Sequence, residues 1–166
     1  MDKRVVANEV LLEDAAALMQ EGREVTLKPL GSSMLPFIRG GRDSVRLKKM
    51  PSVAVGDMLL VRLKGWPEAS GDNRGQSPLN KDSARDVVIA PRYVLHRLIQ
   101  KDGERLTLMG DGNLTGTENC TEADVLGTVT AIERGRRVVV PGNGRWWRVL
   151  KPFRRYILGI YRRLFI

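Results

Sequence analysis

The sequence predicts a mainly β protein, with a coiled, partly closed antiparallel sheet, an N-terminal helix and a basic amphipathic C-terminal helix. Short apolar runs recur at close spacing, with Gly, Asp or Asn turns between them, which is typical of antiparallel strands. An amphipathic pattern precedes these runs, and a pattern rich in arginine and aromatic residues follows them. The chain of 166 residues is long enough for one domain with a substantial core.

The first expected element is a helix that begins near Asn8, a capping residue, and ends near Gly22, a favoured terminator. Glu9 suits the first turn of a helix. One face carries the apolar residues Leu11, Leu12, Ala15, Leu18 and Met19. We interpret it as a helix packed on the sheet rather than a DNA-reading helix. The apolar stretch before it stops at Asn8, so no secretion signal is predicted.

The expected strands follow in chain order. They cover residues 24–28, 43–47, 58–63, 87–89, 93–99, 106–109, 125–133 and 136–140. Gly56 and Asp57 suit a tight turn, and residues 101–104 suit a hairpin. Residues 65–86 differ, because 13 of these 22 are Gly, Pro, Ser, Asn or Asp. This composition predicts a long exposed loop or a disordered insertion, with a lid over the site as the less favoured alternative.

The charge of the chain is divided unevenly. The net charge is +9, but residues 134–166 hold ten Arg and Lys and no Asp or Glu, which leaves 18 basic and 19 acidic side chains in residues 1–133. A near-neutral body with one basic element argues against a specific nucleic-acid partner. The single cysteine, Cys120, excludes a disulfide framework, and its polar neighbours suggest a loop residue without a role. No metal or other cofactor is expected.

Two separate stretches carry the candidate chemistry. Residues 31–36 read Gly-Ser-Ser-Met-Leu-Pro, and Pro36 disfavours helical backbone at the residue before it, so the serines lie on an extended or turning segment. Gly31 lets another backbone approach closely. His96, the only histidine, lies in an expected strand, and the next strand ends in the turn Gly110-Asp111-Gly112-Asn113.

In this order, the Ser-Met-x-Pro, His-Arg and Gly-Asp-x-Asn motifs resemble the S24/S26 serine peptidase superfamily. That group includes the type I signal peptidases and the LexA-like self-cleaving repressors, and the resemblance covers roughly residues 24 to 132. It implies the signal peptidase/LexA-like type of sheet, Ser33 as the nucleophile and His96 in the place where most bacterial signal peptidases have a lysine. It also implies cleavage of signal or leader peptides after small residues.

The chemistry of these residues agrees with such a role. A serine hydroxyl near neutral pH needs a base within hydrogen-bonding reach, and an imidazole, with a free pKa of roughly 6.5, can take the proton and return it to the leaving amine. The sequence leaves open which carboxylate would orient the imidazole. In histidine-type relatives, the Asp of the Gly-Asp turn is followed six residues later by a second Asp. Counted from Asp111, that position is Thr117 in this chain. Glu118 could serve if the loop gains one residue. Asp111 could serve directly or only stabilise its turn, and Asp124 is less favoured.

The expected substrate path surrounds the nucleophile. An extended peptide would pair beside residues 25–30, where Pro29 interrupts the pairing because it has no N–H. The residues expected to contact substrate are Val25, Leu27, Gly31, Ser32 and Met34. Many Gram-negative signal peptidases have an oxyanion-hole serine at the position of Gly31. The donor expected here is therefore the backbone N–H of Ser33.

The basic tail, residues 142–166, is expected to follow a peptidase-like domain over residues 1–141. A helix over residues 153–166 would be about 21 Å long, too short for a bilayer core of roughly 30 Å. Residues 146–166 suit either peripheral contact with an anionic membrane or packing on the body. The expected location is cytoplasmic, with peripheral membrane contact as an option.

Three function classes follow from these observations. The first is a serine endopeptidase that processes peptides or precursor proteins. The second is a LexA-like self-cleaving regulator, which is disfavoured because there is no room for a DNA-binding domain before Ser33. The third is a catalytically inactive peptide- or membrane-binding module.

Overall fold

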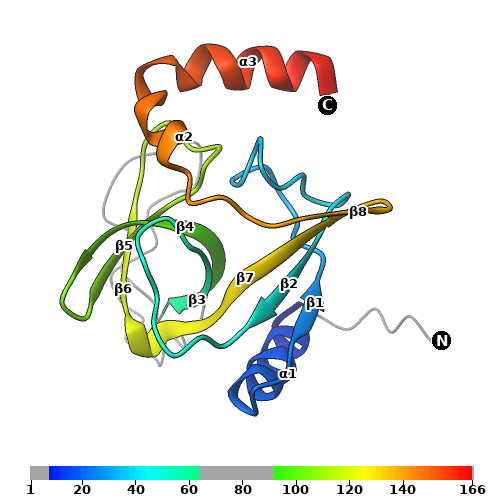
Figure 1. Cartoon of the computed structure of the whole chain (residues 1–166), viewed down its shortest axis with the longest axis vertical. Helices are drawn as coiled ribbons and strands as arrows, with labels where there is room; N and C mark the ends of the chain where they lie inside the picture. The colour runs from blue at the N-terminus through cyan, green and yellow to red at the C-terminus, as the bar shows by residue number, and fades with distance from the viewer. Residues whose placement is uncertain (1–7, 64–91, 166) are drawn as a thin grey trace, which may run out of the picture.

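The protein is mainly β, which confirms the expected fold class. The computed structural model describes residues 8–63 and 92–165, in which eight antiparallel strands form one sheet that curls into a half-barrel (Figure 1). The strands are β1 (Val25–Leu27), β2 (Ser44–Lys48), β3 (Met58–Leu63), β4 (Arg92–Asp102), β5 (Arg105–Met109), β6 (Glu118–Thr121), β7 (Val125–Arg134) and β8 (Arg137–Val139). The α-helices are α1 (Asn8–Gln20), α2 (Arg145–Val149) and α3 (Arg154–Phe165).

The strands lie in the order β1-β2-β7-β3-β4-β5-β6, and β8 pairs with the end of β7. The long strand β7 pairs with β3 through its first half and with β2 through its second half. Register shifts interrupt the β2–β7, β3–β7 and β4–β5 ladders, with the extra residue in β7 for the first two and in β4 for the third. Such bulges increase the local twist of a strand, which accounts for the curling of this sheet.

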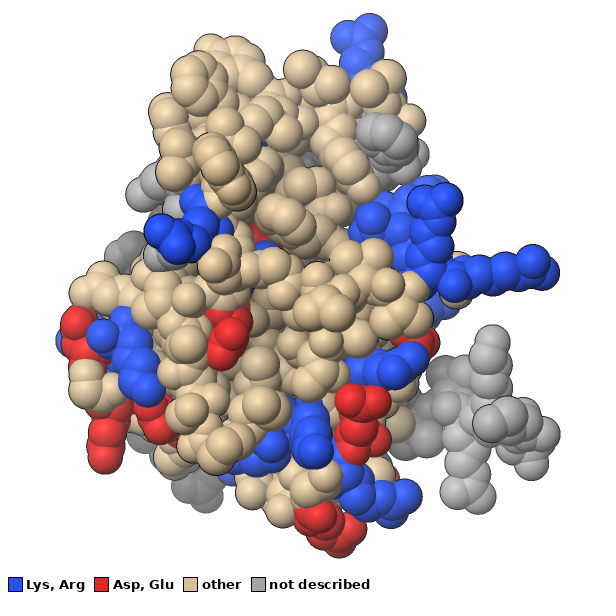
Figure 2. All heavy atoms as spheres, in the orientation of Figure 1, with Lys and Arg blue, Asp and Glu red and all other residues tan. Residues whose placement is uncertain are grey.

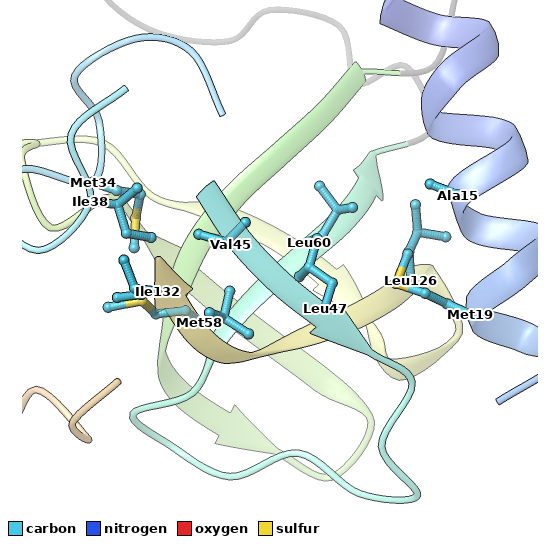
Figure 3. Packing of buried hydrophobic residues seen from close by; sticks show 11 residues of the cluster. Ala15, Met19, Met34, Ile38, Val45, Leu47, Met58, Leu60, Leu126 and Ile132 are labelled. Atoms are coloured by element: carbon cyan, nitrogen blue, oxygen red, sulfur yellow. The ribbon is translucent and has the colours of Figure 1, made fainter. Parts of the chain in front are cut away.

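Both faces of the sheet are buried at β3, where successive residues enter two different cores. Met58 and Leu60 join the first core, together with Ala15 and Met19 of α1. Figure 3 shows this core, with α1 at one end and Met34 and Ile38, from the segment after β1, at the other. The second core lies on the opposite face and contains Leu59, Val61, Leu98, Leu106, Leu108, Cys120 and Val125.

Helix α1 packs on the sheet as expected. Its C-terminal end is capped by Gly22, whose φ is +81°, with hydrogen bonds from Gly22 N to Met19 O and from Arg23 N to Leu18 O. These two bonds form a Schellman motif, which requires the left-handed conformation that glycine adopts without strain. Gly127 of β7 leaves room for the end of the Met19 side chain, because a Cβ there would lie 2.5 Å from Met19 Sδ.

The structure differs from the sequence-based expectations in several places. Strand β6 was not expected, and it removes Cys120 from the predicted polar loop, since this cysteine is buried in the second core. Burial, with the nearby Asp124 and Glu118 carboxylates, raises the pKa of its thiol to about 11, so it is not a thiolate at neutral pH. Helix α2 was also not expected as a separate element. The expected strand 87–89 and insertion 65–86 lie outside the described residues.

The C-terminal segment crosses back over the segment that follows β1. Trp147 of α2 and Leu158 of α3 form a third core with Leu35. The ring of Trp147 also meets Phe37 edge to face, with centroids 5.5 Å apart. In Figure 1, α3 lies above the light-blue segment that follows β1, in agreement with these contacts.

Candidate active site

Ser33 lies on the irregular segment between β1 and β2, just before two residues that anchor it in the fold. Met34 is buried in the first core and Leu35 in the third. Gly31 has a φ of +83°, a backbone conformation that side chains disfavour. A Cβ at Gly40 would lie 2.0 Å from Gly31 O, so the returning chain presses directly on the backbone before Ser33. The two glycines allow the tight path that presents this serine.

The turn after β5 packs against the backbone of Ser32 and Ser33. Gly112 N donates a hydrogen bond of 2.7 Å to Ser33 O. A Cβ at Gly110 would lie 2.5 Å from the same Ser33 oxygen, and one at Gly112 would lie 2.4 Å from Ser32 O. Side chains at either glycine would therefore push the two segments apart. This close packing links two of the three motifs that the sequence singled out.

His96 is buried on β4, opposite Leu59 of β3, and 5% of its surface is exposed. Its Nδ1 lies 2.7 Å from Glu118 Oε2. Because a carboxylate only accepts hydrogen bonds, Nδ1 carries the proton and Nε2 of the neutral ring is an acceptor. This is the tautomer that a general base for a hydroxyl requires.

The register of the sheet explains why Glu118 reaches His96. Glu118 is paired with Leu108, and Leu108 with Leu98. Directly paired residues project from the same face of a sheet, and so do residues two apart on one strand. Glu118 and His96 therefore share a face.

The carboxyl group of Glu118 is ionised at neutral pH. Its burial acts to raise the pKa, but the hydrogen bond from His96, the charge that this ring carries when it is protonated and the charge of Arg92 outweigh burial and lower the pKa below its usual value. Arg92 Nη2 also donates to Glu118 Oε1 over 3.2 Å. Glu118 is thus held between a cation and the imidazole.

Asp111 has a different partner from the one that a catalytic role would give it. Its carboxylate accepts hydrogen bonds from Arg97 Nε and Nη2 at 2.7–3.0 Å, and both side chains are about 2% exposed. Arg97 also donates to Gly56 O and Gly142 O. Since alternation sends adjacent strand residues to opposite faces, His96 and Arg97 each meet a carboxylate on their own side.

Asp124, the least favoured candidate, accepts hydrogen bonds from the backbone N–H and hydroxyl of Thr121. It caps the 3₁₀ turn Glu122–Asp124 between β6 and β7. Of the three carboxylates considered, only Glu118 is hydrogen-bonded to His96.

Ser33 and His96 line the same cavity. It has a volume of about 150 Å³, and its walls are Pro29, Leu30, Gly31, Ser33, Met34, Ile38, Gly40, Tyr93, Val94, Leu95 and His96. An adjacent cavity of about 250 Å³ shares Pro29, Leu30, Tyr93 and Leu95 with the first and is lined by Leu27 and other apolar residues. The two cavities together extend from Ser33 and His96 toward α1 and β1, and the lining of the first is both polar and apolar.

The residues expected to contact substrate fall in different places. Gly31 and Met34 line the cavity with Ser33, and Leu27 lines the adjacent one. Val25 is paired with Leu47 and packs against the first core. Ser32 is exposed and lines neither cavity.

Two residues that the sequence did not single out contribute to this region. Tyr93 lines both cavities, and its buried hydroxyl has no hydrogen-bond partner among the described residues. Trp147 Nε1 donates to Asp111 O over 2.9 Å, which ties the C-terminal segment to the turn behind Ser33. Nothing in the local sequence of Trp147 reveals this contact, because its partner lies 36 positions away.

Comparison with known proteins gave no match to a family model, a curated protein or a solved structure. Within the described residues, no helix is both long and apolar enough to cross a membrane. The same residues contain no group of three His, Cys, Asp or Glu side chains that could hold a metal ion.

Proposed function

We propose that this protein is a serine endopeptidase, with Ser33 as nucleophile, His96 as general base and Glu118 as the group that orients the imidazole. One observation carries the proposal: Ser33 and His96 line a common cavity, and Glu118 fixes the ring of His96 so that Nε2 is the free acceptor. The resemblance of the motifs to the S24/S26 superfamily supports the same assignment.

The proposed reaction begins with attack of Ser33 Oγ on the carbonyl carbon of a peptide bond. His96 Nε2 takes the hydroxyl proton, and the ionised Glu118 stabilises the imidazolium. The tetrahedral intermediate collapses when His96 returns the proton to the amine nitrogen, which leaves with one product. Water then attacks the acyl-enzyme, again with His96 as base, and releases the carboxylate product and Ser33.

The developing oxyanion needs hydrogen-bond donors near the nucleophile. The backbone N–H of Ser33 donates no hydrogen bond to the described residues, so it is available for this purpose. This N–H belongs to the peptide unit before the serine, and the hydrogen bond from Gly112 N to Ser33 O fixes the next peptide unit, so the backbone is held immediately after this donor. Such fixed backbone dipoles stabilise charge without reorganisation during the reaction.

The surroundings favour an extended peptide as substrate. Within the described part of the sheet, β1 is an edge strand, and residues 92–96 of β4 are paired with β3 alone. Either edge can accept main-chain hydrogen bonds from an added strand. A cavity of about 150 Å³ beside Ser33 favours a small side chain at the scissile residue.

A mixed peptide library, read by mass spectrometry, tests the proposal. Wild type should cleave a subset of peptides after small residues, whereas Ser33→Ala and His96→Ala should reduce cleavage at least about 10³-fold without a change in fold. Ser32→Ala is the matched control and should retain activity, because Ser32 lines neither cavity. Cleavage by Ser33→Ala at the wild-type rate would remove the proposal.

A further inference from the structure

Helices α2 and α3, with the 3₁₀ turn Lys151–Phe153 between them, expose several large apolar side chains. Phe153, Tyr156, Ile160 and Leu164 are 59–69% exposed, and they recur at the three- and four-residue spacing of one helix face. Trp146 and Val149 of α2 extend this set, at 83% and 70% exposed. A contiguous apolar surface of this kind marks an interaction site.

The opposite side of the same helices is fixed to the body. Leu158 is buried against Leu35 and Trp147. Arg154 is buried over the Trp147 ring, with 5.2 Å from its guanidinium carbon to the ring centroid, and donates to Trp147 O. The apolar face therefore points outward because a second face already occupies the packing contact with the body.

The charge around this face has one sign. Residues 134–166 contain no Asp or Glu, and Arg136, Arg137, Arg145, Arg155 and Arg163 are exposed. Figure 2 shows mostly uncharged surface over α3, with blue at its edges, while most of the red lies lower on this view. A partner for this face must accept both apolar insertion and positive charge.

We infer that the outer face of α2, α3 and the turn between them, formed by Trp146, Val149, Phe153, Tyr156, Ile160 and Leu164, docks on an anionic lipid bilayer. An α-helix of 12 residues is about 18 Å long, so it suits binding parallel to the surface. Trp and Tyr side chains favour the boundary between headgroups and acyl chains, and exposed arginines are attracted to anionic headgroups. The inference holds whether or not Ser33 is catalytic.

This surface lies close to the candidate active site. The inner face of α3 contacts Leu35, two residues after Ser33, and Trp147 binds the turn that supports Ser33. Docking would therefore hold the cavity near the membrane, where a peptide tethered to the bilayer could reach it.

Vesicle flotation of the full-length protein tests the inference. Vesicles with equal parts of phosphatidylglycerol and phosphatidylcholine should bind the protein at least about tenfold more tightly than phosphatidylcholine alone, and added salt should weaken this binding. The variant F153S/I160S/L164S should bind at least about tenfold less tightly, and so should R155E/R163E.

Two matched variants control for general effects. M50S/V55S/L114S removes three exposed apolar side chains elsewhere, and R62E/R105E makes the same change of charge on exposed strand residues. Both should bind like wild type. Equal weakening in the controls, or no preference for anionic vesicles, would overturn the inference. A third result would also overturn it: the wild type forms a dimer and does not bind vesicles, and F153S/I160S/L164S is a monomer. The face would then bind a second copy of the chain.

Discussion

The charge of Glu118 provides the sharpest test of how His96 would work. The substitution Glu118→Gln keeps a side chain of the same shape, whose amide oxygen can still accept the hydrogen bond from His96 Nδ1. It removes only the negative charge next to the ring. Because the bond is 2.7 Å long, the two charge centres lie about 4 Å apart once the ring is protonated. At an effective dielectric constant of about 20, the charge stabilises the imidazolium by about 4 kcal/mol.

This energy applies only in the transition state, where His96 carries the proton. We therefore expect kcat for the best library peptide to fall about 10³-fold, with little change in KM. Initial rates over a range of peptide concentrations give both constants. Glu122→Gln is the control, since Glu122 pairs with the half-buried Lys101, away from His96, and the substitution should leave kcat unchanged. A Glu118→Gln variant within tenfold of the wild-type kcat would refute this role of the carboxylate.

Three further predictions concern stability. Arg97→Met should destabilise the fold by about 3–5 kcal/mol, seen as a lower midpoint in urea, because it leaves the buried Asp111 carboxylate unpaired; a loss below about 1 kcal/mol would contradict this. Tyr93→Phe should leave stability unchanged or raise it by about 1 kcal/mol in thermal unfolding, since it removes a buried hydroxyl without a partner, and clear destabilisation would show that the hydroxyl is bonded. For Asp43, burial acts to raise the pKa, but hydrogen bonds from Arg134 and Arg39 outweigh burial and lower the pKa below its usual value. The ionised Asp43 therefore stabilises the fold fully above about pH 4, the pKa of an Asp in the unfolded chain. This stabilisation is lost as the pH falls through the lowered pKa of the folded protein. Urea midpoints for wild type and Asp43→Asn should therefore converge as the pH falls below about 4, and a constant difference would contradict this.

Much of the fold could be predicted from local patterns. Alternation and turn residues place most strands to within a few residues, and Gly22 ends α1 by the expected mechanism. Strand β6 could not be predicted in this way, because Glu118-Asn119-Cys120-Thr121 contains a single apolar residue and its pairing with β5 comes from tertiary structure. The burial of Arg154 could not be predicted for a similar reason, since its contact with the ring of Trp147 exists only in the folded chain.

The candidate site was predictable in part. The sequence singled out Ser33 and His96, and the fold brings both to one cavity. It left Glu118 and Asp111 open, because the choice depends on the register between β4, β5 and β6, which no local pattern specifies. Once the register is known, strand alternation separates them, with Glu118 on the side of His96 and Asp111 on the side of Arg97.

Covalent trapping tests the central claim, that His96 activates the hydroxyl of Ser33, most directly. A peptidyl phosphonate with a small residue next to phosphorus should form one adduct, which tandem mass spectrometry should locate on Ser33. The adduct should be absent in Ser33→Ala and should form at least about 10²-fold more slowly in His96→Ala. An adduct on another residue, or a Ser33 that stays unmodified while the wild type cleaves peptides, would contradict the claim.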